Sequence, residues 1–302
     1  MDEGSVIEGL WEPVDERRCE LGEGARFIAP EGFGEEQFVC VDLLRGRLFS
    51  TAGHSGSGLV PRAELGRPLG AVARLRGEPA VWVGALGEGL SLLAEEGETL
   101  VERELLGSPA ADRPVRLRMN DAVADPHGRF WAGAMAYDGD EGQGFLARLD
   151  MDGTVTVVIE GMSIPNGPAF SADGRAMYLA DTPTGRIRTY DVDPATGGLG
   201  EGRDFVHVEE GGPDGMTVDA EGCLWVAIWG ASCLHRYSPE GVLLERIPVP
   251  ARQPTSVAIS SAPPYRAVVT SAAIGLEAPE AHDGRVLTAP VAVAGIPAAP
   301  FG

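Results

Sequence analysis

Four oxygen-bearing side chains occupy the same position of a short frame that recurs along this 302-residue chain. They are two carboxylates and two amides, at Glu23, Asn120, Asn166 and Asp214. Successive frame positions are separated by 46, 51, 46, 48 and 41 residues. In chain order the six positions are Glu23, Leu69, Asn120, Asn166, Asp214 and Thr255. Oxygen ligands of this kind suit a hard divalent cation such as Ca²⁺, Mg²⁺ or Mn²⁺, and Zn²⁺ also accepts carboxylates.

A second repeat indicates which elements carry these residues. Trp131, Tyr178 and Trp225 are 47 residues apart, and each follows a glycine-containing turn. Helical periodicity is nearly absent, while 42 Gly and 23 Pro are spread along the chain as turns between short strands. A period of this size predicts a β-propeller with one blade per repeat. We therefore expect an all-β fold of six four-stranded antiparallel blades with a central metal site. It forms one domain over residues 1–302, with residues 1–15 as a peripheral N-terminal segment.

The first strand of each propeller blade lines the central channel, so one repeat position places its side chains around one point on the axis. The alternative is that Asn166-Gly167 and Asp214-Gly215 are plain turns, because Asn and Asp before Gly favour them. Arg118 lies two residues before Asn120 and shares its face of the strand. It either binds a hydroxyl-rich or anionic ligand in the channel or balances the charge of Asp121 or Asp125.

Composition excludes several classes of function. All 24 basic residues are arginine, so lysine chemistry, including Schiff bases and P-loops, is excluded. A net charge of −21 argues against a nucleic-acid partner. No apolar stretch is long enough to span a membrane, and no signal peptide is visible, so we expect a cytoplasmic protein.

The cysteines and the loop motifs give weaker signals. Four scattered cysteines read as small buried residues rather than a disulfide framework, although Cys223 and Cys233 could lie on neighbouring strands. The five histidines show no metal-binding spacing. The Gly53–Gly58 stretch lacks the lysine and the helix of a phosphate-binding loop, so we expect a flexible loop of undefined role.

Several of these segments together resemble the SMP-30/gluconolactonase family, which includes regucalcin and bacterial sugar lactonases. The resemblance extends from about residue 20 to residue 290, and residues 118–135 are its most specific part. The segments are Leu21-Gly22-Glu23-Gly24, Arg118-Met119-Asn120-Asp121, Asp125 to Met135, Ile164-Pro165-Asn166-Gly167, Pro213-Asp214-Gly215-Met216, Pro254-Thr255-Ser256-Val257 and Val269-Thr270-Ser271-Ala272.

The resemblance implies a role for each matching residue. One divalent ion, which could be Ca²⁺, Zn²⁺, Mn²⁺, Mg²⁺ or Fe²⁺, would be held by Glu23, Asn166 and Asp214. Arg118 and Asn120 would bind a sugar lactone, and Asp214 would also act as the base. Some relatives bind substrate with an acidic residue just beyond Gly-x-Met, which makes Asp138 a further candidate.

The resemblance therefore predicts a metal-dependent hydrolase that opens a sugar lactone to its aldonic acid. The alternatives are another ester or phosphotriester hydrolase on the same propeller, or a non-catalytic propeller that binds an ion, a sugar or another protein. The residues after Glu23-Gly24 depart from the family pattern, since Ala25-Arg26-Phe27 replaces its usual aromatic and acidic continuation. The sugar and the oligomeric state stay open.

Overall fold

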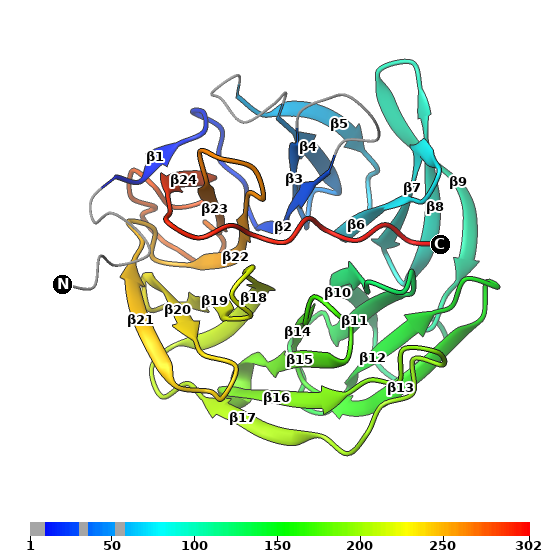
Figure 1. The fold of residues 1–302 in the computed structure, drawn as a ribbon. Helices are drawn as coiled ribbons and strands as arrows, with labels where there is room; N and C mark the ends of the chain where they lie inside the picture. The colour runs from blue at the N-terminus through cyan, green and yellow to red at the C-terminus, as the bar shows by residue number, and fades with distance from the viewer. Residues whose placement is uncertain (1–9, 30–35, 52–57) are drawn as a thin grey trace.

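The computed structural model describes residues 10–29, 36–51 and 58–302. Over these residues the chain forms six four-stranded antiparallel sheets around a central axis (Figure 1). The predicted all-β six-bladed propeller is thus confirmed. Within the described ranges, no helix is long and apolar enough to cross a membrane. Except for Gly58, the Gly53–Gly58 loop lies outside the described residues.

Blades 1 to 5 each use four strands that follow one another in the chain, and the first of the four forms the inner edge (Figure 1). Blade 1 contains β2 (Gly22–Ile28), β3 (Gln37–Asp42), β4 (Arg47–Ser50) and β5 (Val60–Glu64). Blade 2 contains β6 (Leu69–Leu75), β7 (Glu78–Leu86), β8 (Gly89–Glu96) and β9 (Thr99–Gly107). Blade 3 contains β10 (Leu117–Ala124), β11 (Phe130–Ala136), β12 (Gly144–Leu149) and β13 (Val155–Met162). Blade 4 contains β14 (Pro165–Phe170), β15 (Ala176–Asp181), β16 (Arg186–Asp191) and β17 (Arg203–His207), and the 3₁₀ turn η1 (Thr182–Thr184) connects β15 to β16. Blade 5 contains β18 (Gly212–Val218), β19 (Leu224–Trp229), β20 (Cys233–Tyr237) and β21 (Leu243–Pro248).

Blade 6 joins the two ends of the chain and closes the ring. Its first three strands are β22 (Pro254–Ile259), β23 (Arg266–Ser271) and β24 (Leu287–Pro290). The fourth is β1 (Glu12–Pro13), which pairs antiparallel with β24. Residues 12 and 13 of the N-terminal segment are therefore the outermost strand of this blade, and their pairing ties the beginning of the propeller to its end.

The 47-residue aromatic repeat marks equivalent positions on the second strands of three blades. Trp131, Tyr178 and Trp225 each pair with the inner strand one step from its end. The indole nitrogens of Trp131 and Trp225 each donate a hydrogen bond to the turn aspartate six residues earlier, Asp125 at 2.9 Å and Asp219 at 2.8 Å. In blades 3 and 5 the aspartate of the Asp-x-x-Gly turn therefore accepts a buried hydrogen bond that fixes the turn to the second strand. We call this hydrogen-bonded turn the strut of the blade.

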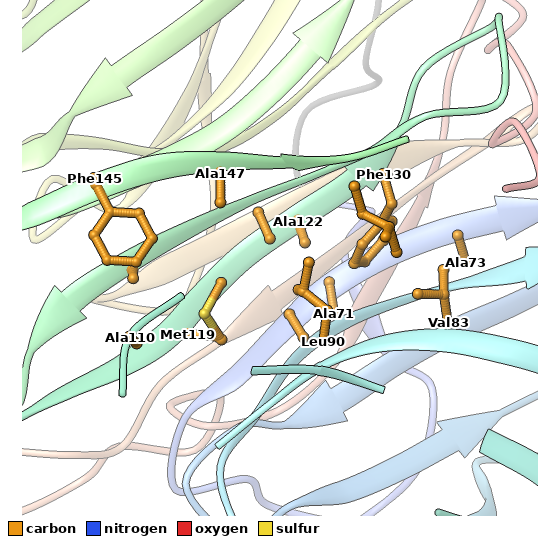
Figure 2. Packing of buried hydrophobic residues seen from close by; sticks show 14 of the residues in the cluster. Ala71, Ala73, Val83, Leu90, Ala110, Met119, Ala122, Phe130, Phe145 and Ala147 are labelled. Carbon is orange, nitrogen blue, oxygen red and sulfur yellow. The ribbon is translucent and has the colours of Figure 1, made fainter. Parts of the chain in front are cut away.

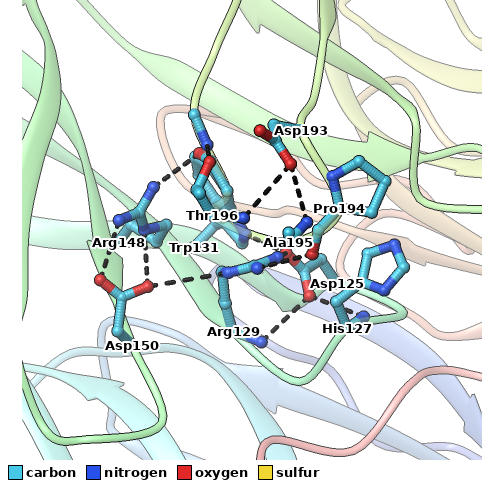
Figure 3. Close-up of polar contacts among 12 residues, drawn as sticks. Asp125, His127, Arg129, Trp131, Arg148, Asp150, Asp193, Pro194, Ala195 and Thr196 are labelled. Atoms are coloured by element: carbon cyan, nitrogen blue, oxygen red, sulfur yellow. Dashed lines mark hydrogen bonds and ion pairs between the residues drawn. The ribbon is translucent and has the colours of Figure 1, made fainter.

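The strut of blade 3 also holds the neighbouring blade (Figure 3). Arg129 pairs with Asp125 at 3.2 Å and donates a hydrogen bond to the Pro194 carbonyl of blade 4 at 2.7 Å. Arg148 donates to the Gly197 carbonyl at 2.6 Å in the same loop. Side chains of one repeat therefore fix the position of the next.

Apolar side chains fill the spaces between blades. Figure 2 shows the contact between blades 2 and 3, where small residues let large ones of the facing sheet approach closely. The residues at its centre are buried, so they supply hydrophobic stabilisation and rigidity together. Its members include Ala71, Ala73, Val83, Leu90, Met119, Ala122, Phe130, Phe145 and Ala147.

A C-terminal segment, residues 291–302, crosses the ring from blade 6 to blade 2 (Figure 1). Its backbone is hydrogen-bonded to inner strands, from the Ala298 amide to the Phe27 carbonyl and from the Phe301 amide to the Arg74 carbonyl, both at 2.8 Å. Both acceptors lie near the ends of their strands, whereas the predicted site residues lie at or near the strand beginnings. The segment therefore covers the end of the channel that is farther from the site.

All four cysteines are buried and unpaired, as the sequence predicted. Cys223 precedes β19, and Cys233 pairs with Ile228 at the opposite end of the same hairpin. The two thiols therefore do not interact. Burial raises the pKa of the Cys19 thiol to about 12, so it stays protonated near neutral pH.

The strut in blade 5 gives a test of the fold. Asp219→Ala should lower the free energy of unfolding by about 3–5 kcal/mol, because it leaves the buried Trp225 indole without its acceptor and removes the buried carboxylate partner of the Arg236 guanidinium. Asp173→Ala, in the corresponding but exposed turn of blade 4, should cost at most about 1 kcal/mol. Urea unfolding measures both, and equal losses would contradict the strut's role.

Candidate functional site in the central channel

A β-bulge interrupts each inner strand at the level of the predicted site. In five of the six blades, two inner-strand residues face one residue of the second strand. In blade 6 a single extra residue, Thr255, has this place. Asn120 and Asp214 lie inside their bulges, and Glu23 and Asn166 directly precede theirs. Because a bulge bends its strand and redirects side chains, the repeat position aims these groups away from the regular ladder.

The two amides belong to a chain of hydrogen bonds that connects three blades. Arg118 Nη1 donates to Asn120 Oδ1 at 2.8 Å, and Asn120 Nδ2 donates to Asn166 Oδ1 at 2.9 Å. Asn166 Nδ2 donates to Thr182 Oγ1 at 2.8 Å, and that hydroxyl donates to the Pro213 carbonyl at 2.7 Å. The chain ends one residue before Asp214. It therefore fixes the orientation of both amides beside the carboxylates.

The carboxylates of Glu23 and Asp214 are buried, with 5% and 3% of each residue exposed. Burial raises the pKa of Glu23 well above its usual range, and the nearby Asp214 raises it further. Burial likewise raises the pKa of Asp214, with Asp121 adding to the shift. Asp214 Oδ1 is buried and has no hydrogen-bond partner within residues 10–29, 36–51 and 58–302. A buried carboxylate oxygen of this kind is costly unless a cation or a donor faces it, so the residues fit a divalent metal ion.

Arg118 belongs to this group rather than to an ion pair elsewhere. It is 6% exposed and also donates to the Met119 carbonyl at 3.1 Å. The alternative partners considered from the sequence, Asp121 and Asp125, pair with Arg26 and Arg129 instead, at 3.1 and 3.2 Å. Burial lowers the pKa of Arg118, while Glu23 and Asp214 oppose that shift. Its charge therefore acts on the channel carboxylates.

Asp138 lies apart from the buried group. It is exposed in the turn after β11, where it accepts a hydrogen bond from the Asp140 amide at 3.3 Å. The turn is at the end of the sheet where β10 begins, since Leu117 pairs with Ala136. Tyr137, beside it, stacks under the Arg116 guanidinium at 4.5 Å. Asp138 therefore belongs to the rim near the channel, and its contact with a substrate stays a prediction.

Three residues that lie near the site were not predicted from the sequence as part of it. Asp121 is 1% exposed and contributes to the raised pKa of both Glu23 and Asp214. Arg26 pairs with it, and Thr182 orients Asn166. The acid that follows Asn120 in the sequence was a signal for Asp121. For Arg26 and Thr182, no spacing pattern indicated a place beside the channel.

A second group of potential metal ligands occurs in the described part of the chain, at Asp219, Glu221 and Cys223. The guanidinium of Arg236 already neutralises it, at 2.8 Å from Asp219 and 2.6 Å from Glu221. Asp219 also accepts the Trp225 bond of the blade 5 strut. This group is explained as a structural ion-pair network.

Fold and site together define a six-bladed propeller with a buried group of carboxylates and amides on the inner strands of its blades. The model of the SMP-30/gluconolactonase/LRE-like region matches residues 21–273. The chain belongs to this family, as its motifs predicted.

The names of similar proteins support the interpretation that this chain is an enzyme. The chain is 33% identical to pentonolactonase XacC of Haloferax volcanii over 81% of this chain and 79% of that protein. It is also 33% identical to 6-deoxy-6-sulfogluconolactonase of Pseudomonas putida, over 82% and 84%. A crystal structure of a calcium-binding protein, regucalcin from Agrobacterium tumefaciens, superposes with a TM-score of 0.85 at 28% identity, covering 96% of each chain. These likenesses support a lactone hydrolase.

The geometry predicts where a divalent cation binds. If the cation binds between the two buried carboxylates, Glu23→Gln should weaken binding of Mn²⁺ or Ca²⁺ to chelator-treated protein by at least about tenfold, because it removes one of their two charges. Isothermal titration calorimetry measures the change. The matched variant Glu104→Gln, on exposed β9, should bind like the unaltered protein. Equal affinity in all three proteins would exclude Glu23 as a ligand.

Proposed function

We propose that the protein is a metal-dependent hydrolase that opens a sugar lactone to the aldonic acid. The observation that carries the proposal is the convergence of two buried carboxylates, one with an unpartnered oxygen, on a network containing Arg118, Asn120 and Asn166. The lactonase names of relatives that align with most of the chain support this substrate class.

We propose Glu23, Asn166 and Asp214 as the residues that hold one divalent ion, whose identity is open among Ca²⁺, Zn²⁺, Mn²⁺, Mg²⁺ and Fe²⁺. When bound, such an ion supplies Lewis-acid polarisation of the lactone carbonyl. The hydrogen bonds between Asn120, Asn166 and Thr182 keep the Asn166 amide from rotating. Held groups of this kind lower the cost of reorganisation during the reaction.

Asp214 is the proposed base. Among the described residues its Oδ1 has no hydrogen-bond partner, so this oxygen can accept a proton from an attacking water. The water oxygen forms a bond to the lactone carbonyl carbon, the bond from that carbon to the ring oxygen breaks, and the ring oxygen takes up a proton. The products are a carboxylic acid, which ionises at neutral pH, and a hydroxyl group.

Arg118 and Asn120 are proposed to hold the sugar. In the hydrogen bonds described above Arg118 donates only through Nη1, so Nε and Nη2 can face sugar hydroxyls. Asn120 is fixed by its own bonds to Asn166 and to the Pro165 carbonyl at 3.0 Å. A rigid anchor of this kind positions the ring for attack. Asp138, on the rim, is proposed as a further contact.

The free and buried cysteines fit the reducing cytoplasm, where we propose that the enzyme acts.

Replacement of the base tests the mechanism. Asp214→Asn should lower kcat/KM for a sugar lactone by a factor on the order of a thousand, because it removes the proton acceptor and one proposed ligand charge. Steady-state assays at saturating Mn²⁺ or Ca²⁺ measure the loss, and Glu104→Gln serves as the unchanged control. Near-wild-type turnover by Asp214→Asn would overturn its assignment as base.

A chelation and substrate test separates the rival functions. Treatment with EDTA should abolish lactone hydrolysis, and adding back one divalent metal should restore it. Hydrolysis of aryl esters or organophosphates without any hydrolysis of sugar lactones would favour the related ester or phosphotriester hydrolase. A protein that binds no metal and hydrolyses none of these would be a non-catalytic propeller.

A further inference from the structure

A buried ion pair crosses the channel beside the proposed metal ligands. Arg26 on β2 of blade 1 contacts Asp121 on β10 of blade 3, from Nη2 to Oδ1 at 3.1 Å. The residues are 7% and 1% exposed. The guanidinium also donates to the Ala25 carbonyl at 2.7 Å and the Ala122 carbonyl at 3.0 Å. The pair therefore links two blades that are not neighbours.

Asp121 extends this link to a third blade. Its Oδ2 accepts a hydrogen bond from the Gly167 amide at 3.2 Å, and its Oδ1 accepts one from Ala122 at 2.8 Å. Gly167 directly follows Asn166, so Asp121 holds the backbone beside a proposed metal ligand. With these bonds and Arg26, the carboxylate of Asp121 is already fully engaged.

The pair also sets the charge around the site. Three buried carboxylates, those of Glu23, Asp121 and Asp214, interact electrostatically with one another. In the described structure Arg26 neutralises Asp121 directly, and Arg118 interacts electrostatically with Glu23 and Asp214. Two acids therefore remain for a cation. On its other side, Arg26 lines a cavity of about 80 Å³ beneath the C-terminal segment, so it separates the site from the covered end of the channel.

We propose that Arg26 and Asp121 are a positioning pair for the metal site. By pairing with Asp121, Arg26 keeps the Asp121 carboxylate bonded to the Gly167 amide, next to Asn166. The same pairing prevents Asp121 from acting as a third acidic ligand of the cation. The inference rests on the cation site of the proposed function and adds two residues that do not themselves touch the cation. A merely structural pair would weaken the site when either partner is lost. A charge-setting pair predicts effects of opposite sign.

Calorimetric titration of chelator-treated protein with Mn²⁺, and separately with Ca²⁺, distinguishes these roles. Arg26→Met removes a positive charge and should tighten binding by a factor on the order of ten. Asp121→Asn removes a negative charge but keeps an acceptor for Arg26 and Gly167, and should weaken binding by a similar factor. The double variant restores the net charge and should bind within about threefold of the unaltered protein.

A matched surface substitution controls for simple loss of net charge. Arg47→Met removes a guanidinium from the exposed pair with Glu64, in which the side chains are 43% and 66% exposed, and should leave the affinity unchanged. Circular dichroism verifies that each variant folds. If Arg26→Met alone does not fold, the recovery of affinity from Asp121→Asn to the double variant still carries the test.

The outcomes separate the positioning role from the metal site itself. Weakened binding in both single variants, or unchanged binding in both, overturns the positioning role while the unaltered protein still binds the cation. An unaltered protein that binds neither Mn²⁺ nor Ca²⁺ at millimolar concentration overturns the cation site and the inference together.

Discussion

Like charges buried at one point are the constraint on which the centre of this propeller depends. Glu23, Asp121 and Asp214 come from three different blades and meet in a region from which water is largely excluded. Buried carboxylates that face one another repel, so each needs a counter-charge or a set of hydrogen-bond donors. Arg26 satisfies Asp121, which leaves Glu23 and Asp214 incompletely compensated. That remaining imbalance of charge is why these two carboxylates fit a divalent cation.

A site of this kind needs a rigid frame, because the apo protein would relax by moving the carboxylates apart. The frame resists that movement in three ways. The Asp219 strut and its counterpart in blade 3 fix turns to strands, the packed faces lock neighbouring blades, and pairing of β1 with β24 closes the ring. The stabilising contacts away from the axis thus offset the electrostatic repulsion between the carboxylates at the axis. Functional sites often store such local cost in an otherwise well-packed fold.

The sequence predicted those features that repeat, and it missed those that depend on contacts between distant blades. Blade number followed from the spacing of Trp131, Tyr178 and Trp225, and the inner strands followed from the frame that contains Glu23. Repeats are visible because each one must solve the same local packing problem. The pair between Arg26 and Asp121 joins residues 95 positions apart and has no counterpart in the described parts of the other blades. The partners of Arg118 were left open for the same reason, since only the closed ring decides which acid it can reach.

Net charge connects the site to the rest of the surface. The chain carries 45 acidic and 24 basic residues, and most of its arginines are held in ion pairs such as that of Arg47 with Glu64. The proposed reaction converts an uncharged ring into an anion inside a protein of net charge −21. Such a field leaves the entry of the neutral lactone unaffected and favours departure of the anionic product. The C-terminal segment covers the far end of the channel, so we expect both to pass the rim where Asp138 and Tyr137 lie. Low ionic strength strengthens this repulsion, and product inhibition should therefore weaken as salt is removed.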